Sequence, residues 1–449
     1  SHRYLPNSLF IFRLLWNAVE NNLMPQSNLS IQSAVEADLE SFARFGVDLS
    51  LDRIEKLLAD LGNPHEQVPM IHVAGTNGKG SVCAYLASVL KAAGYRTGRY
   101  TSPHLVNWTE RICIDGVPIS WTDLQIHLDT VKAAINHLDP TPTQFEVFTA
   151  AAWLYFAQQQ VEVAVVEVGL GGRLDATNVW QKPLATVIVS ISRDHWQRLG
   201  DTIAEIAGEK AGILKPDVTA IAGPLPPEAQ AVVAARATEV GAPLTWIVPA
   251  KAAAVSSAGS LPELIYNGVH YPQALLGDHQ RINSACAIAT LQTLRTQGWA
   301  ISDETIAKGM AQVQWPGRLQ KGRWQGHHLL IDGAHNQAAA KSLRAYIDQA
   351  FANQPITWLM GMLSTKDHAG VFAELLRAGD RLHLVPVPGH LSAQADELEA
   401  IAQHSCPALA STKVHNDLAA GLAAATQTAP VVLCGSLYLI GYFYEHHGS

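Results

Sequence analysis

Short apolar runs alternate with amphipathic segments along most of this chain. The first run, residues 70–74, leads into a glycine-rich turn and then into a segment whose apolar residues recur with the helical period. Further β-branched runs, each followed by a polar turn, are Tyr95–Tyr100, Val163–Val168, Ala185–Ile191 and Val218–Ile221. This alternation predicts a parallel sheet covered by helices, in which ligands collect at the carboxyl ends of the strands.

Further elements are expected before and after this region. A helix is expected over Ile31–Phe45 and a hairpin over Leu264–Tyr271. A Pro-Gly break in Trp315–Arg318 precedes a new series of predicted strands, at His328–Asp332, Thr357–Leu363, Leu382–Val387 and Val431–Cys434. The pattern predicts an α/β protein with an N-terminal P-loop-type parallel-sheet domain, residues 1–317, and a smaller Rossmann-like C-terminal domain, residues 318–449.

Composition narrows the classes of partner and compartment. A chain of 449 residues is long enough for two cores, and its net charge of −8 argues against nucleic acid as a partner. The five cysteines are scattered and include no C-x-x-C pair, which indicates buried thiols in a reducing cytoplasm. The apolar run Leu9–Val19 is interrupted by Arg13 and Asn17 and is too short to span a membrane. Residues 1–30 are therefore expected to form an extension of unassigned role.

The glycine-rich turn carries the clearest chemistry. It contains seven consecutive residues, Gly75, Thr76, Asn77, Gly78, Lys79, Gly80 and Ser81. Glycines let several backbone N–H groups face one point, and the following helix adds its positive end, so the turn suits phosphate. Lys79 can reach the outer phosphates and Ser81 a Mg²⁺ ion. Two residues separate Gly75 from Gly78, rather than the usual four, so a purely structural turn remains an alternative.

Polar residues at other strand ends could complete a magnesium site. Ser81, Ser102 and Glu167 supply the oxygen ligands that Mg²⁺ prefers. Glu167 ends an apolar run, where a carboxylate is costly unless it is paired or metal-bound; a salt bridge to Arg173 or a helix cap is the alternative. Ser102 lies in a Ser-Pro pair that could be a simple turn. His195 is by type more often a hydrogen-bonded loop residue than a magnesium ligand.

Other polar positions are less specific. Lys210 is by default a solvated helix lysine. Asp332 and His335 follow a predicted strand in the second half and would face the gap between the domains, where they could grip a nucleotide, with Arg318 adding a positive charge to the phosphates. Asn336, directly after them, could simply be a helix N-cap.

Six ordered motifs together resemble a known family. They are Gly75–Ser81, Thr101–Leu105, Glu167–Asn178, Glu209–Ile213, Trp315–Arg318 and Asp332–Asn336. They occur in the order seen in the folylpolyglutamate synthases and dihydrofolate synthases of the Mur ligase superfamily. The resemblance runs from about residue 35 to Gly441, so the first thirty residues lie outside it.

The resemblance implies an ATP-dependent ligase that adds L-glutamate to a folate or dihydropteroate through an acyl phosphate. It implies that the turn and Lys79 bind the phosphates, that Lys210 is carbamylated, and that His335 takes part in catalysis. The residues that it assigns to nucleotide are the turn with Asn283, Arg318, Asp332 and His335; to metal, Ser81, Ser102, Glu167 and His195; and to the pterin and folate side, Phe145, Glu146, Arg173 and Asp175.

The resemblance leaves some points open. It implies two Mg²⁺ sites, with a monovalent cation as a further candidate, and a cytoplasmic monomer. Which acceptor is used, a reduced folate, dihydropteroate or both, is not indicated. Two departures from the family pattern, Arg193 and Trp196 around the expected metal histidine and Thr365 at a frequently acidic position, affect details of metal and glutamate binding. The rival functions are a ligase for a peptidoglycan precursor and an ATP-dependent switch without ligation.

Overall fold

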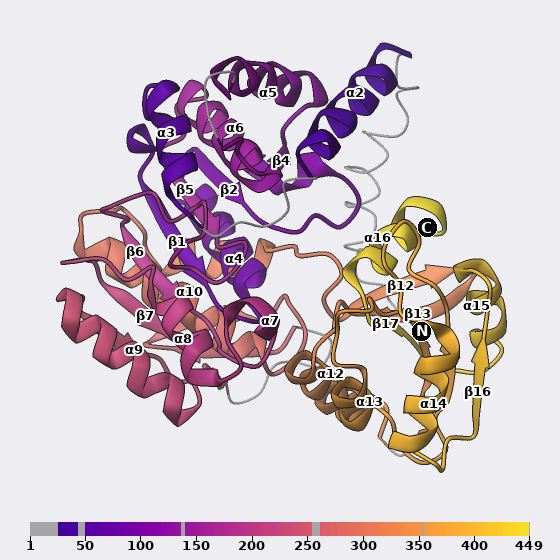
Figure 1. Cartoon of the computed structure of the whole chain (residues 1–449). Coiled ribbons are helices and arrows are strands. Elements are labelled where there is room, and N and C mark those ends of the chain that lie inside the picture. The colour runs from indigo at the N-terminus through magenta and orange to yellow at the C-terminus, as the bar shows by residue number, and fades with distance from the viewer. Residues whose placement is uncertain (1–25, 44–49, 136–139, 254–260, 353, 449) are drawn as a thin grey trace, which may run out of the picture.

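The protein is an α/β structure built on two large sheets (Figure 1). The computed structural model describes residues 26–43, 50–135, 140–253, 261–352 and 354–448. The expected extension therefore lies mostly outside the described residues, and helix α2, Gln26–Ala43, begins within its last part. The predicted fold class is confirmed, because strands and helices alternate through both halves of the chain.

The first sheet has eight strands in the order β4-β3-β2-β5-β1-β6-β7-β8. The six strands from β2 to β8 in this order are parallel, and β3 and β4 add an antiparallel edge. In that order the bounds are Val117–Pro118, Ile112–Ile114, Thr97–Tyr100, Val163–Glu167, Met70–Ala74, Ala185–Ile188, Ala220–Ala222 and Leu244–Trp246.

Helices cover both faces of this sheet, so its central strands are buried throughout. One face packs on α4 (Lys79–Ala92), α10 (Gln280–Thr296) and α11 (Asp303–Gln312). The other face packs on two groups of helices, with the first group over β2 and β5 and the second over β6 and β7. The first group contains α2, α3 (Asp52–Asp60), η1 (Pro64–Gln67), α5 (Trp121–Ile135) and α6 (Gln144–Gln158). The second group contains α8 (Ile203–Ala211) and α9 (Pro227–Val240).

Two short helices and a small sheet complete the first half. The short helices η2 (Trp108–Arg111) and α7 (Trp196–Leu199) follow strands β2 and β6 along the chain. A three-stranded antiparallel sheet contains β9 (Lys251–Ala252), β10 (Glu263–Tyr266) and β11 (Val269–Pro272). The pairing of β10 with β11 confirms the predicted hairpin.

The second sheet has six strands in the order β12-β13-β17-β14-β15-β16. All of its pairs are parallel except β12 with β13. In that order the bounds are Gln320–Trp324, His327–Ile331, Val431–Cys434, Thr357–Met360, Arg381–Leu384 and Ser411–Val414. The helices that cover it are α12 (Gln337–Ala350), α13 (His368–Leu375) and α14 (Ala395–Ser405) on one face and α15 (Leu418–Ala425) and α16 (Leu437–His446) on the other.

All nine strands expected from apolar runs form, but most are shorter than predicted. The run from Tyr95 begins as a strand only at Thr97, because the Tyr95 N–H donates to Leu90 O and closes the end of α4. Strands β3, β4, β8, β9, β12 and β16 were not predicted individually. Most of them are edge strands with exposed positions, so they lack a continuous apolar run. Among the described helices, none is long and apolar enough to cross a membrane.

Helix α11 packs so closely on α4 that a side chain at the contact would not fit. A Cβ on Gly309 would lie 2.5 Å from the Val89 Cα. We expect Gly309→Ala to lower the free energy of unfolding by about 1–3 kcal/mol, because backbone must move to admit the methyl group. The matched control is Gly208→Ala on α8, where an added Cβ meets nothing within 4 Å and unfolding should cost about 0.5–1 kcal/mol more. Thermal unfolding midpoints that shift equally in both variants would contradict this packing.

Candidate active site

The glycine-rich turn between β1 and α4 is tightly enclosed. A Cβ on Gly80 would lie 2.5 Å from the Trp315 ring, and a Cβ on Gly78 would collide with the Asn283 side chain. Gly78 also has a φ of 85°, in the left-handed region that favours glycine. Any side chain at these two positions would therefore displace the turn from the first residues of α4.

Helix α10 contacts the end of the turn through two buried amide side chains. The Gln280 Nε2 donates to Ser81 Oγ at 3.3 Å, and the Asn283 Nδ2 donates to Gln280 Oε1 at 3.0 Å. Gln280 and Asn283 are both buried. The structure thus brings Asn283, a residue expected to contact nucleotide, to the turn, together with Gln280, which was not expected.

Glu167 lies at the carboxyl end of β5, facing the turn. Lys79 Nζ is 3.7 Å from Glu167 Oε1, and the Ser102 N–H donates to Glu167 Oε2 at 3.2 Å. Burial raises the pKa of Glu167, and the charge of Lys79 opposes that rise. The alternative pairing of Glu167 with Arg173 is wrong, because Arg173 pairs with Glu209 at 2.8 Å. A buried anion and a cation therefore meet where the turn opens.

Lys210 is buried under the same turn, so its default interpretation as a solvated helix lysine is wrong. Its Nζ donates to Gly75 O at 3.0 Å, and its residue is only 5% exposed. Burial, together with repulsion from Lys79, lowers the pKa of Lys210 to about 7. Near neutral pH this lysine therefore carries a large fraction of uncharged amine.

In the second half, the loop after β13 is ordered by a buried carboxylate. Asp332 accepts hydrogen bonds from the Leu319 N–H and the Ala334 N–H, both at 2.9 Å. Burial raises its pKa, and the charge of Arg318 opposes that rise. Asp332 is buried and Arg318 is partly buried, and each charge favours the ionised form of the other at the carboxyl edge of the second sheet.

Asp194 joins the two halves. Its carboxylate accepts from Lys366 Nζ and from Asn336 Nδ2, each at 2.9 Å. Asn336 also exchanges hydrogen bonds with the Asn77 side chain in the turn, and its Oδ1 caps α12, as the sequence allowed. His335 Nε2 lies 3.9 Å from Asp194. Burial would raise the pKa of Asp194, but Lys366 and the nearby histidines hold it well below its usual range.

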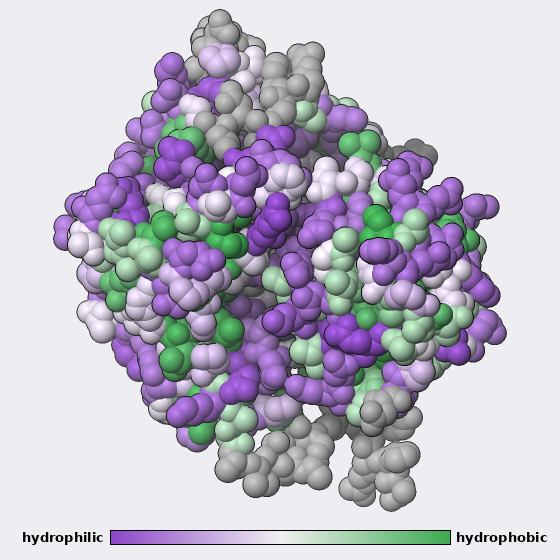
Figure 2. Space-filling model, turned by 60° about the horizontal axis from the view of Figure 1, so that its bottom comes forward, coloured by the Kyte–Doolittle hydropathy of each residue, from purple (hydrophilic) through white to green (hydrophobic). Residues whose placement is uncertain are grey.

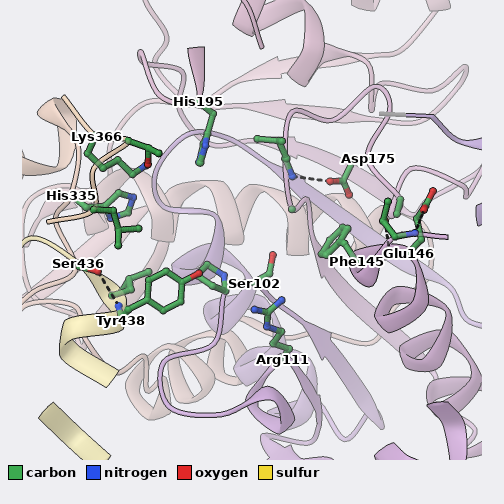
Figure 3. A pocket seen from close by; sticks show the side chains of 18 of the residues that line it. Ser102, Arg111, Phe145, Glu146, Asp175, His195, His335, Lys366, Ser436 and Tyr438 are labelled. Atoms are coloured by element: carbon green, nitrogen blue, oxygen red, sulfur yellow. Dashed lines mark hydrogen bonds between the residues drawn. The ribbon is translucent and has the colours of Figure 1, made fainter. Parts of the chain in front are cut away.

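A cavity of about 390 Å³ opens beside these charges, and residues from both halves line it (Figure 3). Figure 2 shows a face of the molecule that is hollowed between the two halves, with mostly hydrophilic residues at its rim. Of the residues predicted for metal or catalysis, Ser102, His195 and His335 line the cavity. Burial lowers the pKa values of His195 and His335 to about 4, so both rings are neutral at pH 7.

The four residues expected on the folate side divide into two groups. Phe145, Glu146 and Asp175 line the cavity, whereas Arg173 is not among its lining residues and its side chain is 55% exposed. Glu146 already pairs with Arg53 at 3.1 Å. The Phe145 ring packs over Gly169 at the cavity wall.

Arg111 and Tyr438 are among the lining residues of the cavity that the sequence did not predict for the site. Arg111 donates from Nε to His104 Nδ1 at 2.9 Å, and its guanidinium stacks 4.1 Å from the Trp108 ring centroid. Tyr438 stacks on His390 with ring centroids 3.8 Å apart. Arg111 lies next to an apolar run, which was an available signal for a buried cation, whereas no local pattern indicated Tyr438.

Most of the side chains expected to hold metal offer oxygen donors rather than a cluster of carboxylates, thiols and imidazoles. Within the described ranges, no three His, Cys, Asp or Glu side chains come together closely enough to hold a metal ion. Magnesium does not need such a cluster, because it accepts hydroxyl and phosphate oxygens with one carboxylate. Ser81, Ser102 and Glu167 present these donors around the turn, and Lys79 Nζ lies 3.7 Å from the Glu167 carboxylate. The oxygen donors therefore fit Mg²⁺.

Comparison with known proteins decides the family. Residues 73–291 match the Mur ligase middle domain, and residues 318–446 match the dihydrofolate synthetase C-terminal domain. The chain is 38% identical over 360 residues to a dihydrofolate synthase/folylpolyglutamate synthase of Bacillus subtilis, covering 76% of this chain and 81% of that protein. The chain belongs to the dihydrofolate synthase and folylpolyglutamate synthase family.

Solved structures from this family have the same fold. The Mycobacterium tuberculosis folylpolyglutamate synthase complexed with ADP superposes with a TM-score of 0.83 at 31% identity, over 93% of this chain and 98% of that one. Escherichia coli FolC in complex with DHPP and ADP gives 0.80 at 31% identity, over 92% and 97%. The two matched family regions contain the residues on opposite sides of the cavity, with Ser102 and His195 in the first and His335 and Lys366 in the second.

The low pKa of Lys210 has a measurable consequence for stability. Below about pH 7 the ammonium is charged in both the folded and unfolded chain, so the full cost of burying it remains. Between about pH 7 and 10.5 the unfolded chain holds a proton that the folded chain has released, so stability rises by about 1.4 kcal/mol per pH unit. In bicarbonate-free buffer, unfolding of Lys210→Met should lack this slope. Parallel pH profiles for the two proteins would show that Lys210 has an ordinary pKa.

The Lys366–Asp194 pair predicts a second stability effect. Both side chains are about 10% exposed, so Lys366→Met leaves a buried carboxylate without its cation and should cost about 3 kcal/mol of unfolding free energy. Lys321→Met, at an exposed lysine of β12, is the matched control and should change it by less than about 0.5 kcal/mol. The double variant Asp194→Asn/Lys366→Met should recover much of the loss in urea unfolding. A double variant that is no more stable than Lys366→Met alone would show that the loss does not come from the unpaired Asp194 carboxylate.

Proposed function

We propose that this chain catalyses the ATP-dependent joining of L-glutamate to the carboxylate of a reduced folate or of dihydropteroate. The observation that carries the proposal is the position of the phosphate turn, with its Lys79–Glu167 pair, beside a cavity lined from both halves of the chain. Family membership supports the reaction class. The relatives complexed with ADP and with DHPP support a nucleotide and a pterin as ligands.

In the proposed first step, a carboxylate oxygen of the acceptor attacks the γ-phosphorus of ATP, the bond to the bridging oxygen breaks, and ADP leaves. A carboxylate is a poor acyl donor, so the acyl phosphate is needed to activate it. The backbone N–H groups of the turn and the Lys79 ammonium would hold the β- and γ-phosphates, and Arg318 would add positive charge from the second half. Asn283, Asp332 and His335 complete the proposed nucleotide contacts.

In the proposed second step, the uncharged amine of L-glutamate attacks the acyl carbon, the bond from this carbon to the phosphate oxygen breaks, and phosphate leaves while the nitrogen gives up one proton to the phosphate or to solvent. His335 is suited to guide this amine, because its Nδ1–H donates to Gly333 O at 2.7 Å. The neutral ring therefore presents the lone pair of Nε2. That lone pair can accept a hydrogen bond from the amine as it approaches the acyl carbon.

We infer that Ser81, Ser102, Glu167 and His195 bind Mg²⁺ with the nucleotide. The bound cation would neutralise charge on the phosphates. His195 contributes through its neutral imidazole, which faces the cavity (Figure 3). A second Mg²⁺ and a monovalent cation remain part of the proposal.

Lys210 is proposed to be carbamylated. Only an uncharged amine reacts with CO₂, and a pKa of about 7 supplies that form at neutral pH. The lysine nitrogen would bond to the carbon of CO₂ and lose a proton, which turns a buried cation into an anion. Such an anion would suit a second metal ion.

The acceptor would lie in the cavity against Phe145 and Asp175, with Glu146 and Arg173 near its far end. We further infer a cytoplasmic monomer that binds small molecules rather than nucleic acid or membrane, in keeping with the net charge of −8. Two domains that divide at residues 317/318 would place the cavity at their interface.

Phosphate release tests the proposed reaction. With ATP, Mg²⁺ and L-glutamate present, we expect stimulation by dihydropteroate, by tetrahydrofolate or by both, compared with no acceptor. Hydrolysis that is indifferent to both pterins and to glutamate would refute the ligase and favour a nucleotide-dependent switch. Stimulation only by a peptidoglycan precursor would move the chain to another ligase of the superfamily.

Lys79 gives the sharpest single-residue test. We expect Lys79→Met to lower kcat by at least about a hundredfold, because one fixed cation on the transferred phosphoryl group is lost. Lys91→Met, on the last turn of the same helix, is the control and should leave kcat unchanged. Product formation is measured by chromatography of the glutamylated pterin. Near-normal turnover in Lys79→Met would remove Lys79 from the mechanism.

A further inference from the structure

A histidine lies in the middle of β1, where an apolar side chain would be expected. His72 is fully buried, and burial lowers its pKa to about 3, so its ring is neutral. Its Nε2 lies 2.8 Å from Thr177 Oγ1, in the loop that follows β5. The strand that leads to the phosphate turn is thus linked by a side chain to a loop on the cavity wall.

The direction of each hydrogen bond in this link can be deduced. Thr177 Oγ1 lies 2.5 Å from Asp175 Oδ1, and a carboxylate accepts but does not donate. The Thr177 hydroxyl hydrogen therefore points to Asp175, and its oxygen is left to accept from His72. The His72 ring must then carry its proton on Nε2. The order of donation is His72 to Thr177 to Asp175.

This tautomer leaves His72 Nδ1 with a lone pair and no partner in the described part of the chain. The residue beside His72 on the neighbouring strand β6 is Thr186, whose buried hydroxyl also has no partner there. A buried acceptor without a partner is unfavourable, so the histidine is not explained by packing. Its donor on Nε2 is the feature that an apolar residue could not supply.

The link ends on a carboxylate that orders the cavity wall. Asp175 also accepts from the Leu170 N–H at 2.7 Å and from the Thr177 N–H at 3.0 Å, which closes the loop around it. Both Leu170 and Asp175 line the cavity, and Figure 3 shows Asp175 with one of these bonds. A rotated Asp175 carboxylate would release both N–H groups and change the shape of this wall.

We propose that His72 is a positioning residue for the acceptor substrate, because its hydrogen bond to Thr177 fixes the Asp175 carboxylate and the cavity wall around it. This inference rests on the proposed function, in which a pterin acceptor occupies the cavity. His72 is not among the residues that line the cavity, and its side-chain hydrogen bond goes to Thr177 rather than to the turn. Its effect should therefore appear in acceptor binding and not in nucleotide binding.

The test uses three variants of the link: His72→Leu, Thr177→Val and the double variant His72→Leu/Thr177→Val. Thr186→Val is the control. Each single variant in the link should raise the acceptor KM about tenfold, the effect of one buried hydrogen bond, while ADP affinity by calorimetry stays within about twofold. Thr186→Val removes a buried hydroxyl next to His72 but outside the link, so it should leave the acceptor KM unchanged. His72→Gln, which can place an amide donor near Thr177, should restore much of the binding.

The double variant decides whether the two residues act as one unit. We expect its acceptor KM to equal that of the worse single variant, because either change breaks the same link. Additive losses, or an ADP affinity that falls as much as acceptor affinity, would overturn the proposal and indicate general damage to β1. Retained ADP binding also shows that a variant is folded.

A readout independent of activity separates this inference from the proposed function. Amide hydrogen exchange at Leu170 and Thr177 reports directly on their bonds to Asp175. These amides should exchange at least about tenfold faster in His72→Leu than in the unchanged protein or in Thr186→Val. Faster exchange in a protein without ligase activity would refute the proposed function alone. Unchanged exchange in an active enzyme would refute the role of His72.

Discussion

Charges buried at the carboxyl edges of the two sheets are the constraint on which this structure depends. Glu167 at the end of β5 and Asp332 after β13 are each buried, and a carboxylate in such a place must be compensated. Lys79 and Arg318 supply the opposite charges. Because these cations lie at strand ends beside a phosphate turn, the compensation of buried charge and the proposed binding of nucleotide use the same groups.

The site depends on contacts between the halves as well as on each sheet. Asn336 contacts both Asn77 in the turn and Asp194 in the loop after β6, and Lys366 neutralises Asp194. These bonds set the phosphate turn opposite the loop that carries His335. In the proposed reaction the acyl phosphate forms on one side of this junction and is attacked from the other, so the same contacts would keep water from reaching the intermediate between the two steps.

The sequence predicted the elements that carry the turn and several of the site residues, for reasons that differ from one residue to the next. The strand, turn and helix around Gly75–Ser81 follow from local pattern, because parallel strands buried on both faces leave continuous apolar runs. The position of Glu167 at a strand end followed in the same way. By contrast, the burial of Lys210 depends on how α8 packs against the turn. The pairing of Arg173 with Glu209 depends on the same packing. Asp194 and Lys366 are 172 residues apart, and only the arrangement of both halves brings them together.

The central claim is that the turn grips the phosphates of ATP with Lys79. A crystal structure with a non-hydrolysable ATP analogue and Mg²⁺ tests it most directly. The account predicts the β- and γ-phosphates against the N–H groups of the turn, with Lys79 Nζ moved from Glu167 to a phosphate oxygen and the metal beside Glu167. A nucleotide bound elsewhere, with the turn empty and Lys79 still beside Glu167, would contradict it.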